Sequence, residues 1–472
     1  MSPYSRSEED KKIISKTLEA IRLAFAEFLT IPTCIIIGFL LLAAGSYALD
    51  RSKIVWIEPL RDAFKLHIFA DTSATSGLLG TISSGIITVT SITISLLLLA
   101  LQQSASSFSA VVFDQFLRRP LNQSYFGFFI GLALYALVTL ATVNDPFNPV
   151  FGATLALLLT IVALYLLILL LYTTMNQMRP IVVIESIHDL TLAARKRQLC
   201  LIRKTRRTSC YEGAVSTLVT AKRHGSVTHI DIDAIGAVVK DARGEVEIVL
   251  LVSIGSYVAF QDEIAEVKAQ TSEAGVRVKN CVQDAIRLEH QRDIDTDPEY
   301  GIEQLATIAW TSISTSKSNP YPGLLTIYSL RNILAHWSIE QEEDSGNQPI
   351  PVVYTDNVFT RLMDAFESLA VVSSESMQHQ IFAEVVHTFA VMFDRLPPEQ
   401  QQRAESLILR IISALGDHVL TAELDAALSA LVCTFRSSAH SDTADAVQVA
   451  QEELRASIGK LNSRSTRVTG QG

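Results

Sequence analysis

The residues best suited to chemistry in this chain form a row of hydroxyls inside an apolar segment, residues 77–101. The segment GLLGTISSGIITVTSITISLLLLAL is long enough to cross a bilayer as a helix, which takes about 20 residues. Its hydroxyls recur every three or four residues, so they share one helical face. Such a helix offers one face to lipid and one to other contacts. The row consists of Thr81, Ser84, Thr88, Ser91 and Ser95.

Two roles fit this row of hydroxyls. One is helix packing, because small and hydroxyl residues let membrane helices approach closely and hydrogen-bond to one another. The other is the lining of a water-filled path formed by several copies of the chain, since polar side chains line pores. Residues 77–101, 124–143 and 150–175 contain no Asp, Glu, Lys, Arg or His. This absence argues against a proton relay or an ion-coupled carrier.

The sequence lacks recognisable catalytic motifs. It has no GxxxxGK[ST], no GxGxxG after a strand, no GxSxG and no HExxH pattern. Asp293, Asp295 and Asp297 form a DxDxD run, but a calcium loop of the EF-hand kind needs Gly and Glu where Pro298 and Gln304 stand. A solvated acidic turn is expected instead, with Asp297 as the N-cap of a helix whose first residue is Pro298.

The histidines do not predict a metal site. His379, Glu384 and His387 include an ExxH spacing, but helical metal sites of that type need a second such pair on a facing helix. His224 and His229 flank a predicted strand at an odd separation, so they point to opposite faces. We therefore expect no metal, no cofactor and no enzymatic activity.

Composition divides the chain into an apolar part and a part of ordinary soluble character. Apolar residues concentrate in 31–175, although only 49% of the 472 residues are hydrophobic overall. The net charge of −10, without a domain-wide basic surface, argues against nucleic acid as a partner. The five cysteines show no CxxC or zinc spacing, which indicates reduced thiols.

Four stretches are predicted to cross a membrane: residues 31–49, 77–101, 124–143 and 149–175. The turn NDPFNP joins the last two as a helical hairpin. Fifteen Lys and Arg residues flank one side of these spans and four flank the other. Because cytoplasmic flanks carry the excess of Lys and Arg, both termini are predicted to be cytoplasmic.

The predicted organisation has six segments, which differ in composition and periodicity. They are a cytoplasmic N-terminal helix (1–30), a four-span transmembrane domain (31–175), a basic juxtamembrane helical connector (176–221), a small β-rich unit with a helix near 231–241 (222–267), a helical cytoplasmic domain (268–460) and a disordered tail (461–472).

The connector contains a cluster of basic residues with two interpretations. It fits anionic lipid headgroups, each charge contributing about 1 kcal/mol, or it acts as a topology signal alone. The cluster consists of Arg195, Lys196, Arg197, Arg203, Lys204, Arg206 and Arg207.

Three groups of residues carry a resemblance to a known family. They are the hydroxyl-rich second span running into LALQQSASSFS and FLRR; Gly225, Val227, Ile230 and Asp231 with Gly255, Tyr257 and Val258; and Asp297, Gly301, Ile302, Leu305, Ile308, Ala309, Ser314 and Pro320. Over roughly residues 15–430 the chain resembles the bacterial predicted membrane proteins catalogued as domain of unknown function 2254. The resemblance implies four spans followed by a cytoplasmic domain, and no established activity.

The chain departs from the family pattern at three places. Ser226 stands where the family usually has Tyr, and Gln261 replaces a glycine. The loop from Ser314 through Asn319 to Pro320 also differs from the usual motif. The loop SKSNPYPG, Ser316–Gly323, is expected to be a structural corner, with contact to a ligand or partner as the alternative.

The expected fold is a mainly α-helical membrane protein: four transmembrane helices, then a cytoplasmic domain with a small barrel- or sandwich-like β-unit and a helical remainder. The first functional hypothesis is a homo-oligomeric pore or channel-like protein of the bacterial inner membrane, with a cytoplasmic regulatory domain. The alternative is a non-conducting, membrane-anchored sensor or scaffold that binds a cytosolic partner or ligand. The expected partners are the lipid bilayer, other copies of the chain and a cytosolic protein.

Overall fold

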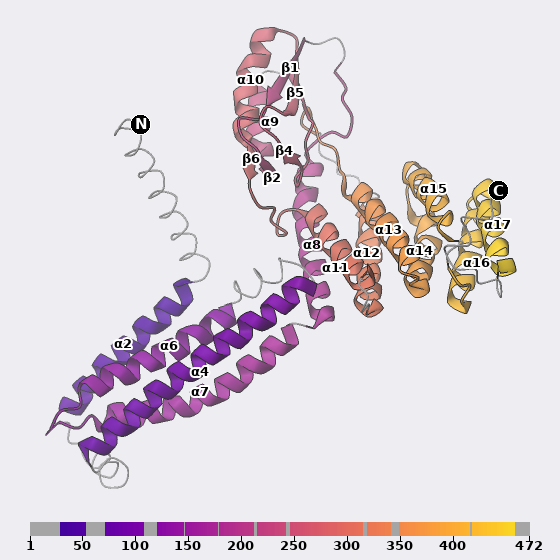
Figure 1. Cartoon of the computed structure of the whole chain (residues 1–472). Helices are drawn as coiled ribbons and strands as arrows, with labels where there is room; N and C mark the ends of the chain where they lie inside the picture. Colours follow the sequence, from indigo (N-terminus) through magenta and orange to yellow (C-terminus); the bar gives the residue numbers. More distant parts are fainter. Residues whose placement is uncertain are drawn as a thin grey trace, which may run out of the picture. The chain divides into compact units, whose positions relative to one another are not determined.

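The computed structural model describes residues 29–52, 71–107, 120–145, 147–177, 179–211, 215–241, 246–314, 319–340, 349–415 and 418–457. The described chain is mainly helical and forms two compact units, residues 1–179 and 180–472 (Figure 1). The predicted N-terminal helix, except its last two residues, and the predicted disordered tail lie outside the described residues.

The described residues of the first unit include four helices long and apolar enough to cross a membrane: α2 (Thr30–Arg51), α4 (Thr72–Ser107), α6 (Pro120–Ala141) and α7 (Val150–Gln177). They confirm the four predicted spans. In α4 the membrane-length stretch is Thr72–Ser95, and the helix continues to Ser107. α6 packs against α2, α4 and α7 (Figure 1).

Close packing and one buried carboxylate hold the first unit together. Gly127 and Gly131 of α6 lie against Pro32 and Phe39 of α2, where an added Cβ would come within 2.8 and 2.4 Å of its neighbours. Asp50 lies in the last turn of α2, one residue after the predicted end of that span at residue 49. Its carboxylate is buried and accepts the backbone N–H groups of Phe151 (2.9 Å) and Gly152 (3.0 Å) at the start of α7. A carboxylate is stabilised there by the helix dipole.

The β-region of the second unit contains two small sheets among its described residues. The first has the order β1-β5-β3-β7, in which β7 is parallel to β3 and the other pairs are antiparallel. The second has the order β4-β2-β6. The strands are β1 (Val215–Thr220), β2 (Gly225–Ile230), β3 (Val246–Leu250), β4 (Tyr257–Val258), β5 (Glu263–Ala269), β6 (Ile286–Glu289) and β7 (Val352–Val353).

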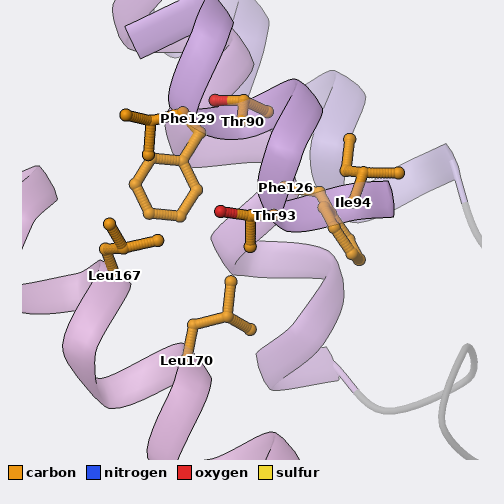
Figure 2. A pocket seen from close by; sticks show the side chains of 8 residues that line it. Thr90, Thr93, Ile94, Phe126, Phe129, Leu167 and Leu170 are labelled. Atoms are coloured by element: carbon orange, nitrogen blue, oxygen red, sulfur yellow. The ribbon is translucent and has the colours of Figure 1, made fainter. Parts of the chain in front are cut away.

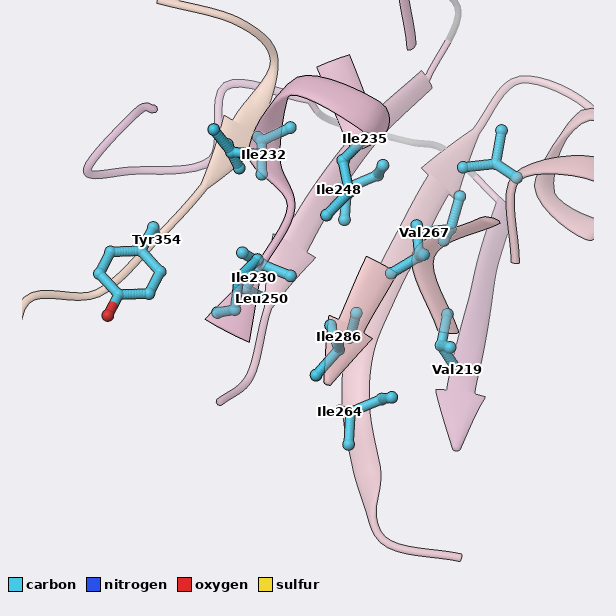
Figure 3. Close-up of a cluster of buried hydrophobic side chains, with 14 of the residues drawn as sticks. Val219, Ile230, Ile232, Ile235, Ile248, Leu250, Ile264, Val267, Ile286 and Tyr354 are labelled. Atoms are coloured by element: carbon cyan, nitrogen blue, oxygen red, sulfur yellow. The ribbon is translucent and has the colours of Figure 1, made fainter. Parts of the chain in front are cut away.

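These sheets are not closed into a barrel, so the barrel-like form of the prediction does not hold. Strands also lie on both sides of the predicted 222–267, since β1 precedes it and β6 and β7 follow it. The helix expected near 231–241 is present as α9 (Ile232–Asp241), and α10 (Ser272–Ala285) follows β5. Branched apolar side chains from both sheets and α9 form the core (Figure 3), among them Ile230, Ile235, Ile248, Val267 and Ile286.

The rest of the second unit is an array of helices: α8 (Pro180–Ile202), α11 (Pro298–Ser314), α12 (Pro320–Glu340), α13 (Val358–Glu375), α14 (His379–Met392), η2 (Phe393–Arg395), α15 (Pro398–Ile412), α16 (Ala422–Ser437) and α17 (Ser441–Ser457). They pack in two layers (Figure 1). One layer runs α11, α13, α15, α17, and the other runs α12, α14, α16. α8 packs on the first pair, α11 and α12. Stacked helix pairs of this kind bury a continuous core between neighbours.

Candidate functional site

The hydroxyl row lies on the outer face of α4. Thr81, Ser84, Thr88, Ser91 and Ser95 are all exposed in the chain. At 3.6 residues per turn the row is opposite the packed face of α4, where Leu79, Ile82 and Ile86 are buried against the other helices of the first unit. Packing among the described helices of the unit therefore does not involve the row.

The hydroxyls of this face donate to the backbone of their own helix. Thr81 Oγ1 donates to the carbonyl of Gly77 (2.8 Å), and Thr88 Oγ1 donates to that of Ser84 (2.8 Å). Ser84 and Ser95 form similar bonds to carbonyls three and four residues earlier. A hydroxyl has one proton and two acceptor positions. Each of these oxygens keeps acceptor capacity that α4 itself does not use.

The packed side of α4 is filled by apolar side chains. Figure 2 shows Thr90 and Thr93 of α4 facing Phe126 and Phe129 of α6 and Leu170 of α7. The cavity between them measures about 10 Å³. That is about the space of a single water, so these residues leave no room for a wider path at this level of the unit.

In the second unit, α11 begins among buried charges. Asp297 is its N-cap, and its Oδ1 accepts the backbone N–H of Tyr300 (3.0 Å). Its Oδ2 accepts from Arg292 Nε at 2.7 Å. The predicted capping role of Asp297 is thus confirmed. Gly255, with φ of +91°, lies so close that an added Cβ would be 2.5 Å from Asp297 Oδ2. Two residues of the family motifs, Gly255 and Asp297, therefore meet here.

Glu299 is the next carboxylate of α11, and its side chain is only 2% exposed. Its Oε2 pairs with Arg361 Nε of α13 at 3.2 Å, and its Oε1 accepts from Ser253 Oγ at 3.4 Å. Burial first, and then the neighbouring charge of Asp297, raise the pKa of Glu299 to about 7, although Arg361 opposes this. Desolvation disfavours the charged form of a carboxyl. Glu299 is therefore a carboxyl that changes its charge near neutral pH.

A groove runs beside Glu299 between α11 and α13 and has a volume of about 370 Å³. We call it the acidic groove. Apolar and small side chains form its floor, and exposed charged side chains and an indole form its rim. It is lined by Glu299, Ile302, Glu303, Ala306, Thr307 and Trp310 of α11 and by Arg361, Asp364, Ala365 and Ser368 of α13.

The basic cluster of the connector is not one continuous set. Arg195 is only 3% exposed and forms ion pairs with Glu340 (2.8 Å) and Asp356 (2.7 Å), so its guanidinium is not available to lipid headgroups. Lys204 pairs with Asp233, and Arg206 pairs with the buried Glu247. The side chains of Lys196, Arg197, Arg203 and Arg207 are exposed, and their headgroup role stays a prediction.

The described residues at the two ends of the 314–320 segment belong to or border helices. Ser314 ends α11, and Pro320 is the first residue of α12. Asn319 Oδ1 accepts the backbone N–H of Tyr321 at 3.2 Å. Gly323 then packs closely against Ile313. Residues 315–318 are outside the described part of the chain, so a ligand role of this loop stays a prediction.

The histidines that were considered as metal ligands lie next to other residues. His379 Nδ1 lies 3.0 Å from Nδ1 of His418, and Glu384 pairs with Arg331 at 2.8 Å. The ring of His224 lies tilted against that of His290, with ring centroids 5.3 Å apart. Among the described residues no group of three or more His, Cys, Asp or Glu side chains is arranged to hold a metal ion.

Sequence reasoning missed the residues that form the acidic groove. Glu299 and Arg361 are 62 positions apart, and each looks like an ordinary surface charge in its own helix. One signal was available for α11, where the lining residues Glu299, Ile302, Glu303, Ala306 and Trp310 recur at helical intervals. That face mixes charge, small residues and an indole, which is unusual for a purely solvated face.

Comparison with known proteins gives one match. A family model described as a predicted membrane protein, domain of unknown function 2254, matches residues 26–381, which is more than half of the chain. This is the family that the sequence motifs resemble, over a shorter range than 15–430. No curated protein and no solved structure matches the chain.

Proposed function

We propose that this chain, which belongs to the family of predicted membrane proteins catalogued as domain of unknown function 2254, is a homo-oligomeric pore of the bacterial inner membrane. The geometry of α4 is the basis of this proposal. In this proposal the hydroxyl face of α4 lines the axis between copies. The second unit is a regulatory domain in the cytoplasm, where both termini also lie. Lys and Arg residues around the spans support this orientation.

The observation that carries the proposal is the exposure of all five hydroxyls on the side of α4 opposite the face that packs against the other described helices of its unit. Their protons are used by the helix backbone in four of the five cases, so outward-facing oxygens are acceptors. A ring of such oxygens would solvate water and cations. The filled packed side of α4 supports a path between copies rather than inside one unit.

Recordings from purified protein in planar bilayers test this function. We expect discrete conductance steps in the wild type and loss of most of the current in the double variant Thr88→Leu/Ser91→Leu, because both leucines replace acceptors with apolar bulk. Ile92→Leu is the matched control, since Ile92 is exposed on the same helix and carries no hydroxyl. A silent wild type, or equal currents in the wild type and the double variant, would overturn the proposal.

A second candidate is a non-conducting, membrane-anchored scaffold or sensor. The two-layered helical array of the second unit favours it, because stacked helix pairs form extended binding surfaces. In this candidate α4 assembles or anchors the protein, and the array binds a cytosolic partner. The acidic groove between α11 and α13 is the part of the array that supports such binding.

A further inference from the structure

The acidic groove has an excess of negative charge that its own arginines do not balance. Four carboxylates gather at or beside it, against two guanidinium groups. Arg292 is engaged by Asp297 and Glu303, and Arg361 is engaged by Glu299 and, at 3.9 Å, by Asp364. The side chains of Glu303 and Asp364 remain 57% and 59% exposed, on opposite walls.

The floor of the groove is shaped for an extended chain. Ala306 and Ala365 leave space between the two helices, and Ile302 is buried beneath them. The lining of α11 runs from Glu299 to Trp310. At 1.5 Å per residue this distance is roughly 16 Å, which matches about five residues of extended peptide.

One end of the groove carries an exposed aromatic ring. Trp310 is 50% exposed, although indole is among the most strongly buried side chains on average. The face of an indole attracts Lys and Arg side chains. Carboxylates on both walls and an indole at one end therefore favour the same chemical class, a cationic side chain.

We propose that the acidic groove binds a basic peptide segment of a partner protein, whose Lys or Arg side chains pair with Glu303 and Asp364 and stack on Trp310. The carboxylates favour a cationic ligand, and the length of the groove favours a peptide over a small amine. The inference is independent of whether α4 lines a pore, and it gives the scaffold candidate its class of partner.

Glu299 gives this binding a pH dependence. The charged and titratable groups that act on Glu299 are Asp297 and Arg292 before α11, Arg361 on α13 and Tyr354 before α13. Glu303 and Asp364 pair with the two arginines, and Asp356 acts on Tyr354. Because the pKa of Glu299 is about 7, the groove gains a negative charge as the pH rises through neutrality. The affinity for a basic peptide should therefore increase severalfold between pH 6 and pH 8.

Fluorescence anisotropy of rhodamine-labelled hexalysine tests the proposal with the full chain in an uncharged detergent. We expect saturable binding that weakens at least tenfold in Glu303→Gln/Asp364→Asn and weakens in Trp310→Ala. Glu423→Gln/Asp442→Asn is the matched control, because it removes two exposed charges from α16 and α17. It should bind like the wild type. Glu299→Gln should remove the increase with pH.

Three outcomes would overturn the proposal. One is equal weakening in the control and groove variants, which would mean non-specific attraction to the acidic protein. Another is displacement of the peptide by spermine at the same concentration as by unlabelled hexalysine, which would indicate a small-amine site. The last is absence of binding by a wild type whose thermal unfolding is cooperative. None of these outcomes depends on conductance.

Discussion

Gly301 shows how a single position joins two helices of the second unit. An added Cβ there would lie 1.9 Å from Oγ1 of Thr191, on α8. Thr191 is fully buried and donates to the carbonyl of Ile187. Glycine thus allows the backbone of α11 to contact α8 directly. The family motif marks Gly301, but the sequence cannot show that Thr191 is its partner, because the two residues are 110 positions apart.

Arg195 shows that a basic cluster can contain a core residue. Replacing it by Met would leave the carboxylates of Glu340 and Asp356 without their buried partner. Removal of one member of a buried ion pair destabilises by roughly 3–5 kcal/mol. We expect a loss of this size for Arg195→Met in urea unfolding followed by tryptophan fluorescence, which includes the nearby buried Trp337.

The control for Arg195 is its exposed neighbour Lys196. Lys196→Met should change the free energy of unfolding by less than about 0.5 kcal/mol. Similar losses in both variants would contradict the core role of Arg195 and would restore a common role for the cluster.

Glu299 gives the second unit a pH-dependent stability. Its pKa is about 7 in the folded chain against an ordinary value of 4.5, so the folded state binds the proton more tightly. The unfolded state thus releases its proton first, and stability falls as the pH rises from about 4.5 to 7. At 1.36 kcal/mol per pKa unit the loss is up to roughly 3 kcal/mol.

Glu299→Gln should remove this part of the pH dependence. The variant is expected to gain stability relative to the wild type as the pH rises from 5 to 8, measured as the unfolding midpoint at each pH. Glu303→Gln, which changes an exposed carboxylate of the same helix, should keep the wild-type slope. Parallel pH profiles for wild type and Glu299→Gln would contradict the raised pKa.

Among the elements, the apolar helices were the most predictable. Continuous hydropathy identified all four spans, and period 3.6 placed the hydroxyls of α4 on one face. Periodicity could not decide which face of α4 meets the other helices. The structure shows that Leu79, Ile82 and Ile86 do so, and that the hydroxyl face remains outside.

The β-region was only partly predictable for a different reason. Runs such as Gly225–Ile230 have local strand signals and became β2. β7 consists of only Val352 and Val353 and pairs in parallel with β3, about a hundred positions earlier. A two-residue strand has no periodicity of its own, so the sheet that it completes cannot be predicted locally.

At the level of the whole molecule, a unit of membrane-length helices and a second unit with two small sheets and a helical array are encoded in one chain. The boundary near residue 179 agrees with the change in composition after the fourth span. The acidic groove could not be predicted, since its two walls come from α11 and α13 and its charged side chains come together only in the folded chain. The family match ends at residue 381, so it includes both walls of the groove and excludes most of α14 and everything after it.

A pore lined by the hydroxyl face of α4 requires this face to meet its counterparts in other copies of the chain. Disulfide crosslinking in native membranes tests that contact, with Cys34, Cys200, Cys210, Cys281 and Cys433 replaced by Ser. Ser91→Cys should give covalent dimers on oxidation, because Ser91 lies on the exposed face. Ser83→Cys should give none, because Ser83 is buried on the packed side of the same helix. A Ser91→Cys protein that stays monomeric, or crosslinks no better than Ser83→Cys, would contradict a pore lined by the hydroxyl face of α4.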